Sequence, residues 1–148
     1  MTIRSLLAFA SCLLLSLPAS GQLRQILYTT VPGDSILNLQ IDLQDSFSVL
    51  TWHNSAVFIE SEIVLATCQD GIFKYVVEQG RYTLKSVSKA PGLTISQAIP
   101  KRAGLTSQNG PCDETIHHRI FIPSDFVMES NRRWTRKESL NKSTINGH

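Results

Sequence analysis

The sequence lacks the short motifs that mark the common enzyme classes. It contains no G-x-S-x-G nucleophile elbow, no glycine loop of the kind that cradles phosphate, and no dinucleotide-binding fingerprint. It also lacks a pronounced charge of either sign, because its 148 residues carry a formal net charge of +2. A nucleic-acid-binding protein usually displays a strongly basic surface. We therefore predict no nucleic-acid partner and no cofactor.

Long apolar runs are also missing. The longest, residues 5–17, spans about 13 residues, whereas a membrane-spanning helix needs about 20. Arg4 precedes this run and small residues follow it, which is the pattern of a cleaved secretory signal. We predict a signal peptide at residues 1–21, with cleavage before Gln22. A membrane anchor is one alternative, and lipidation of Cys12 is another.

Cysteine is scarce, and export would leave two cysteines, Cys68 and Cys112, in an oxidising compartment. We predict a disulfide between them, with two separate thiols as the alternative. The bond would close a loop of about 45 residues and would stabilise the fold by roughly 4 kcal/mol in the chain-entropy description.

Strand patterns dominate the rest of the chain and centre on residues 47–67. Two apolar runs there flank a polar break at Asn54, a residue type that tolerates the backbone of a tight turn. In the second run Ile59 and the other apolar side chains share one parity, and Glu60 takes the other, as in a half-buried strand. We expect Trp52, Asn54, Ile59 and Glu60 to have structural roles, with Trp52 in the core.

Further strand patterns recur about every ten residues, separated by turn dipeptides. Residues 72–77 and 82–87 are predicted to pair as a hairpin, and we find neither a convincing amphipathic helix nor an exact repeat. Seven to eight strands predict an all-β protein, an antiparallel-rich sandwich or roll, with a short β-solenoid as the alternative. The other predicted strands are residues 26–31, 37–43, 93–99 and 115–122.

Charge is distributed unevenly along the chain. Residues 22–128 contain 8 basic and 10 acidic residues, whereas residues 129–148 contain 5 basic and 2 acidic ones. We predict a β domain at residues 22–128 and a basic, disordered tail at residues 129–148. The tail offers cations around one aromatic ring for weak contact with an anionic membrane surface or an acidic glycan. These residues are Arg132, Arg133, Trp134, Arg136 and Lys137.

Histidine side chains are candidate metal ligands and candidate catalytic bases. His117 and His118 are neighbours on a predicted strand and should point to opposite faces, so we predict no metal site. His118 shares the parity of the apolar Ile116, which predicts a hydrogen-bonded, partly buried histidine. The enzymatic alternative is an exported hydrolase or thiol-redox protein that uses Cys112 with a histidine.

Two segments resemble a known type of protein. Trp-His-Asn-Ser at residues 52–55, followed by Val-Phe-Ile-Glu at residues 57–60, resembles a unit of secreted, β-strand-rich bacterial envelope proteins of the head-GIN adhesin type. Arg-Ile-Phe-Ile-Pro at residues 119–123 is similar to the way strands end in such proteins. The predicted cleavage region also looks like that of Gram-negative envelope proteins. The resemblance, over residues 37–126, implies an envelope location and no catalytic residues.

These features favour an exported, non-enzymatic β-domain with a binding, adhesion or scaffolding role at the bacterial cell envelope. It would act in the periplasm or on the outer surface of a Gram-negative bacterium. Its partner would be an envelope protein or a glycan, recognised through an exposed strand edge or the loop at residues 101–113. The alternatives are the enzyme described above and a membrane-peripheral protein held by its basic tail. The sequence leaves the oligomeric state open.

Overall fold

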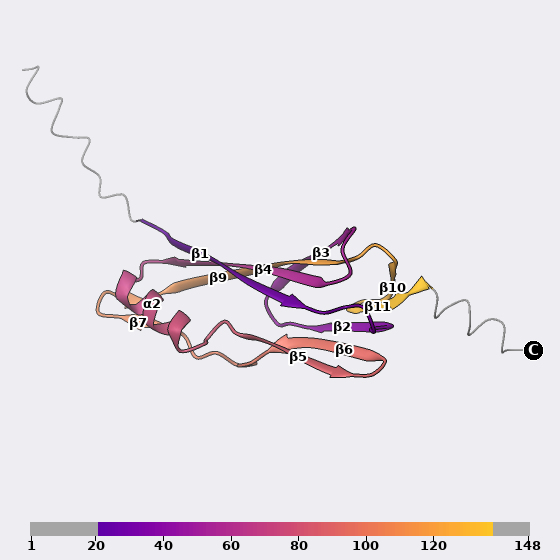
Figure 1. The fold of residues 1–148 in the computed structure, drawn as a ribbon. Helices are drawn as coiled ribbons and strands as arrows, with labels where there is room; N and C mark the ends of the chain where they lie inside the picture. Colours follow the sequence, from indigo (N-terminus) through magenta and orange to yellow (C-terminus); the bar gives the residue numbers. More distant parts are fainter. Residues whose placement is uncertain (1–20, 138–148) are drawn as a thin grey trace, which may run out of the picture.

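The structure, a computed structural model, describes residues 21–137. This part of the chain, drawn in Figure 1, forms eleven strands and one short helix, and two of the strands are only two residues long. In chain order the elements are β1 (Leu23–Val31), β2 (Asn38–Asp42), β3 (Ser46–Trp52), β4 (Val57–Ala66), α2 (Asp70–Glu78), β5 (Leu84–Lys89), β6 (Gly92–Gln97), β7 (Thr106–Ser107), β8 (Gly110–Pro111), β9 (Asp113–Pro123), β10 (Phe126–Ser130) and β11 (Arg133–Arg136).

The long strands form two sheets that lie over one another (Figure 1). Sheet A has the order β1-β4-β9-β3, and sheet B has the order β10-β11-β2-β6-β5. Each sheet contains one parallel pair, β3 with β9 and β2 with β6, so both sheets are mixed rather than purely antiparallel. Strands distant in sequence are neighbours, and residues 21–137 form neither a solenoid nor a closed barrel. The solenoid alternative is therefore wrong.

Strand alternation decides which side chains fill the space between the sheets. In β4 every second residue is buried, beginning with Val57, and the residues between them are partly exposed. In β2 Leu39 and Ile41 are buried in the same way. The inward side chains of both sheets meet in one main core. Its members include Leu39, Ile41, Val57, Ile59, Leu93, Ile95, Ile120, Ile122, Phe126 and Trp134.

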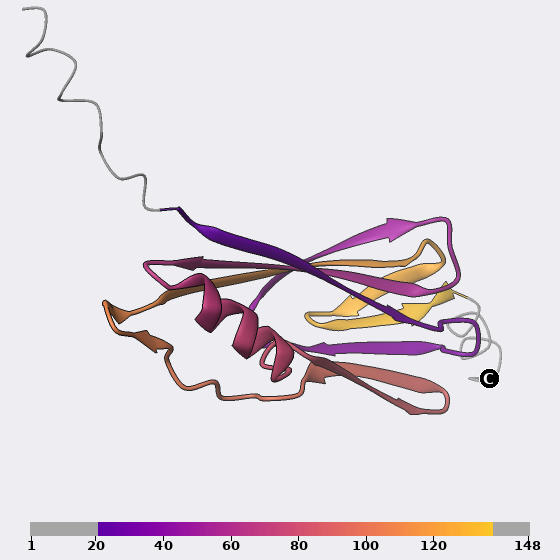
Figure 2. The ribbon, with the colours of Figure 1, turned by 60° about the vertical axis from the view of Figure 1, so that its left-hand side comes forward.

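A second, smaller core lies where α2 covers one end of sheet A (Figure 2). Phe73 and Val76 of α2 pack there against Ile63 and Ile116. The hairpin predicted for residues 72–77 is thus wrong. Ile and Val favour a strand locally, but the spacing of Phe73 and Val76 places both on one helical face, and burial against sheet A decides the outcome.

The predicted domain boundary at residue 128, and the disordered tail after it, are wrong for residues 129–137. The boundary falls inside β10, and β11 lies between β10 and β2. Trp134 of β11 is in register with Leu39 and is 5% exposed. Burial of this ring in the main core stabilises the ordered strand, although the segment around it is polar. The rest of the predicted tail, and residues 1–20 of the predicted signal peptide, lie outside the described residues.

Candidate functional site

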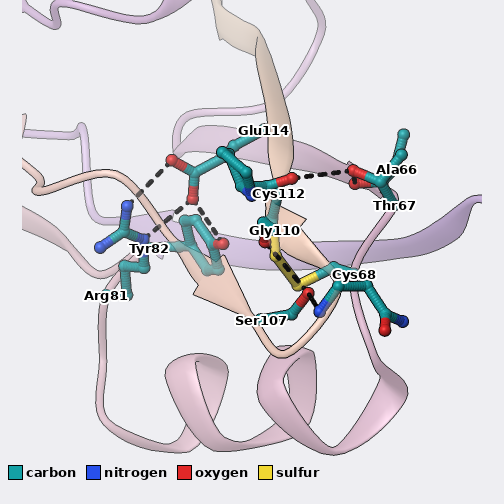
Figure 3. The surroundings of a disulfide bond; sticks show 11 residues. Ala66, Thr67, Cys68, Arg81, Tyr82, Ser107, Gly110, Cys112 and Glu114 are labelled. Carbon is teal, nitrogen blue, oxygen red and sulfur yellow. Dashed lines mark hydrogen bonds and ion pairs between the residues drawn. A yellow bond between two sulfur atoms is a disulfide. The ribbon is translucent and has the colours of Figure 1, made fainter.

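Cys68 and Cys112 form a disulfide that joins the end of β4 to the start of β9 (Figure 3). Their Cα atoms lie 5.0 Å apart, within the range that a disulfide spans. Beside it the Thr67 hydroxyl donates a hydrogen bond to the carbonyl oxygen of Pro111 over 3.1 Å. Neither sulfur is a free thiolate in this structure, although a cysteine nucleophile requires one. The bond accords with the oxidising compartment of an exported protein.

Glu114, close to the disulfide, accepts hydrogen bonds from a guanidinium and a phenol (Figure 3). Arg81 Nε and Nη2 donate to its two oxygens over 2.9 and 3.0 Å, and Tyr82 Oη donates over 2.6 Å. Burial raises the pKa of Glu114, but the hydrogen bonds from Arg81 and Tyr82 outweigh burial and leave that pKa below its usual value. Burial and the nearby carboxylate raise the pKa of Tyr82. Glu114 is therefore held ionised and ties residues 81–82 to β9.

The loop at residues 101–113, one of the predicted recognition elements, is fastened at several points. Arg102 pairs with Asp45, and Arg81 Nη2 donates to the carbonyl oxygen of Ala103 over 2.6 Å. Cys112 secures the end of the loop through the disulfide. The loop also carries the small hairpin of β7 and β8. These contacts make it an integral part of the fold, and none of them singles it out as a binding element.

A cluster of polar side chains, which we call the polar seam, lies between the two hydrophobic cores. His118 Nδ1 is 2.8 Å from Ser61 Oγ, and His118 Nε2 is 3.4 Å from Asp45 Oδ2. Gln97 and Arg102 both donate to the Asp45 carboxylate. The parity of His118 indicated an inward position, but nothing local marked Asp45, Gln97 or Arg102. They reach the seam from segments far apart in the sequence.

Serine, histidine and carboxylate groups in contact are the components of a hydrolase triad, but here the serine and the histidine are closed to solvent. Ser61 is 2% exposed and His118 is 1% exposed. A substrate carbonyl would reach the Ser61 hydroxyl only if the two sheets separated. Burial lowers the pKa of His118, although the hydrogen bond with Asp45 opposes this effect. The imidazole is thus neutral near pH 7, and the seam fixes how the two sheets meet.

The outer face of sheet A carries an exposed cluster of aromatic and aliphatic side chains. Tyr28 and Trp52 each stack on Phe58, with ring centroids 5.8 and 5.6 Å apart. The Phe121 ring lies 5.8 Å from that of Trp52, and Leu50 is in register with Phe121 on β3. Tyr28 is 63% exposed and Leu50 is 45% exposed. We call these five residues the aromatic face.

A polar border adjoins the aromatic face on the same side of sheet A. Glu60 pairs with Arg119 over 2.5 Å, and Glu62 pairs with Arg24 over 2.6 Å. Both pairs link neighbouring strands, and each includes an Arg side chain that is more than half exposed. The outer face of sheet A therefore has an apolar centre with opposite charges beside it.

His117 also lies on this side of sheet A, whereas His118 lies inside the molecule. His117 Nδ1 is 3.0 Å from Ser46 Oγ, and its Nε2 is 3.3 Å from Ser48 Oγ. The two histidines therefore point to opposite faces of β9, as strand alternation predicts. Within residues 21–137 no group of three or more potential metal ligands comes together.

The residues expected to have structural roles occupy β3, β4 and the turn between them. Ile59 is fully buried in the main core. Asn54 Oδ1 accepts a hydrogen bond from the Ala56 N–H over 3.2 Å, which closes an Asx turn. Trp52 is not in the core, contrary to expectation. It shares the outward parity of Leu50 and donates from Nε1 to the carbonyl oxygen of Ala56 over 2.8 Å.

The five residues predicted to form an anionic-surface contact do not form one surface. Trp134 is buried, and Arg136 pairs with Asp125 over 2.5 Å and is largely buried. Arg132 donates to a backbone carbonyl over 2.7 Å. Arg133 is exposed and makes no hydrogen bond or ion pair with any residue of the described chain. Alternation along β11 sends Arg133 to one side of the strand and Trp134 to the other. The five are Arg132, Arg133, Trp134, Arg136 and Lys137.

Comparisons with protein-family models, with curated proteins and with solved structures found no match to this chain. The resemblance to envelope proteins of the head-GIN type therefore stays a prediction. No helix in residues 21–137 combines the length and apolar composition that a membrane crossing needs.

Proposed function

We propose that this protein is an exported, non-enzymatic binding domain of the bacterial cell envelope, and that its aromatic face docks a protein partner. The observation that carries the proposal is the exposure of this apolar cluster. Tyr28 and Leu50 are 63% and 45% exposed. Unlike a single exposed apolar residue, they adjoin the clustered rings of Trp52, Phe58 and Phe121. Contiguous exposed apolar side chains commonly mark interaction sites.

The composition of this face favours a protein over a sugar. Aromatic residues at the centre and charged residues at the edge are typical of protein–protein interfaces. The rings of Tyr28 and Trp52 lie against that of Phe58 at interplanar angles of 12° and 24°. Because the rings cover one another, much of their flat surface is not available for stacking against a sugar ring. Ring edges and Leu50 remain available, and these suit the uneven surface of another protein.

The disulfide supports export, because such bonds persist in oxidising compartments. The apolar run at residues 5–17 supports it independently. The two alternative functions have less support. A cysteine nucleophile would first require reduction of the Cys68–Cys112 bond, and a membrane contact through the basic segment would lack Trp134, which is buried.

Site-specific crosslinking tests the aromatic face. A photoreactive phenylalanine analogue replaces Tyr28 in the full chain, expressed in its own host. A matched variant carries the same probe at Val87, which is 59% exposed on sheet B. We expect the Tyr28 probe to give one discrete crosslinked protein in the envelope fraction, whereas the Val87 probe does not.

The substitution Leu50→Arg, added to the Tyr28 probe chain, provides the second arm. It places a charge in the proposed interface without touching either core, and we expect it to abolish the crosslink while the thermal midpoint changes little. Equal crosslinking from Tyr28 and Val87, no crosslink from Tyr28, or a crosslink that survives Leu50→Arg would each count against the proposal.

A further inference from the structure

A polar cavity lies on the outer face of sheet B. The inner faces of the two sheets meet in the main core, so this cavity and the aromatic face are on opposite sides of the molecule. Its volume is about 270 Å³. The side chains of Leu39 and Leu93 point into the core, and alternation therefore turns their polar neighbours toward the cavity. The lining includes Asn38, Gln40, Gly92, Thr94, Glu129 and Arg133.

Much of the hydrogen-bonding capacity in this cavity is unused. The Thr135 hydroxyl lies 2.9 Å from Glu129 Oε2 and 3.3 Å from Asn38 Oδ1, and this contact positions both side chains. The amide nitrogen of Asn38 and the second oxygen of Glu129 make no hydrogen bond to the described residues and can serve a ligand. The side chains of Gln40 and Arg133 make no hydrogen bond or ion pair within residues 21–137. The cavity therefore offers both donors and acceptors.

The position of the cavity limits the kind of ligand. Strand β2 is interior in sheet B, with β11 on one side and β6 on the other. Its backbone groups are used by these two neighbours, so an extended peptide cannot add to it as a strand. Recognition must use the amides, the Thr94 hydroxyl, and the opposite charges of Glu129 and Arg133. Sugar hydroxyl groups, which both donate and accept, match this set.

A second hollow continues along the same pair of strands. It has a volume of about 200 Å³ and is lined in part by Asp42, Ser96 and Pro100. Asp42 is in register with Ser96, just as Gln40 is in register with Thr94. Outward side chains recur about every 6.6 Å along a strand, so polar groups extend from one hollow to the next. We call the two hollows together the polar groove.

We infer that the polar groove binds a neutral glycan chain, with one sugar residue in each hollow. The larger hollow is close to the lower limit of small-molecule sites, roughly 300 Å³, which suits a single ring rather than a large ligand. Opposite charges at Glu129 and Arg133 leave the larger hollow without a net charge. The site is independent of the aromatic face, and a domain with both could link an envelope protein to a glycan.

Titration of the mature, oxidised chain followed by NMR tests the inference. The probes are cellotriose and chitotriose, which are neutral, and trigalacturonate, which is acidic. We expect a neutral probe at millimolar concentration to shift the side-chain amide signals of Asn38 and Gln40 and the Nε–H signal of Arg133. The substitution Gln40→Ala should weaken binding roughly tenfold, because it removes hydrogen bonds from an exposed side chain and leaves the core intact.

The control is Tyr28→Ser, which alters the opposite face and should leave the affinity for the neutral probe unchanged. Absence of shifts with both neutral probes would overturn the inference. Tighter binding of trigalacturonate than of either neutral probe would make the groove an anion site and would also overturn it. Gln40→Ala without effect on the affinity would place binding elsewhere on the protein.

Discussion

Trp52 and Trp134 have the same side chain but different surroundings. Trp134 is 5% exposed and belongs to the main core, where it packs with Phe126 and residues of both sheets. Trp52 is half-buried on the outer face of sheet A and contacts Phe58 and Phe121. The apolar area removed from water therefore differs between the two rings. This difference separates a core residue from a residue of the proposed docking face.

We predict that Trp134→Ala lowers the free energy of unfolding by about 3–5 kcal/mol, as is usual for an aromatic ring removed from a core. Trp52→Ala should cost about 1–2 kcal/mol, because this variant loses partial burial and ring contacts but leaves no internal cavity. Urea denaturation of the two variants measures which substitution lowers the free energy of unfolding more. A larger loss for Trp52→Ala would contradict the assignment of the two rings.

At the scale of elements, β11 shows how pairing overrides local composition. The segment is rich in Arg, a composition that predicts disorder, yet it fills the position between β10 and β2. Trp134 is in register with Leu39, so both side chains enter the main core. Arg136, two residues along the strand, donates to the carbonyl oxygen of Gly33 over 2.8 Å and pairs with Asp125. Without β11, sheet B would be split.

Truncation tests this role of β11. A chain ending at Ser130 keeps β10 but should lose several kcal/mol of stability or fail to fold, since it lacks Trp134 and separates β10 from β2. The control is a chain ending at Lys137, which keeps every described strand. Near-ultraviolet circular dichroism and urea denaturation compare the two chains. Equal unfolding midpoints would show that β11 is dispensable, as a disordered tail would be.

At the scale of the whole molecule, the polar seam joins two cores that would otherwise be separate. Sheet A contributes Ser61 and His118. Gln97 and Arg102 come from other segments, and both donate to the carboxylate of Asp45. An unpaired polar group at such a depth is costly, so each partner constrains the others. The seam therefore specifies how sheet A, sheet B and the loop at residues 101–113 fit together.

The seam also predicts acid sensitivity. Burial lowers the pKa of His118 in the folded state. As the pH falls below about 6.5, the imidazole of His118 therefore takes up a proton in the unfolded chain before it does so in the folded chain. The free energy of unfolding should therefore decrease as the pH falls from about 7 through 6.5 and further, by up to roughly 1.4 kcal/mol for each unit by which the pKa is lowered.

Urea denaturation of the wild type and of His118→Gln across this range measures the effect. The variant keeps a polar side chain that does not titrate, so its stability should depend less on pH. The effect of His118 occurs at a higher pH than that of Glu114. The lowered pKa of Glu114 affects stability only as the pH falls below about 4.5. Equal pH dependence in the wild type and the variant would rule out His118 as the cause.

The sequence by itself determined that the chain is mostly β and which side of β4 and of β9 faces inward. Alternation identified Ile59 as inward and Glu60 as outward, and it placed His118 inside and His117 outside. These properties depend on neighbouring residues of one strand, and they can be read from a period of two. The sequence also showed that two cysteines were available for a disulfide, and its apolar run at residues 5–17 predicts export.

The tertiary structure alone decided which strands are neighbours and what covers each face. Residues 72–77 became a helix because sheet A offered an uncovered end, and β11 became ordered because β2 needed a partner. The aromatic face, the polar seam and the polar groove each combine residues from segments far apart in the sequence. Their side chains meet only after the long-range pairing has formed, and no local pattern encodes that pairing.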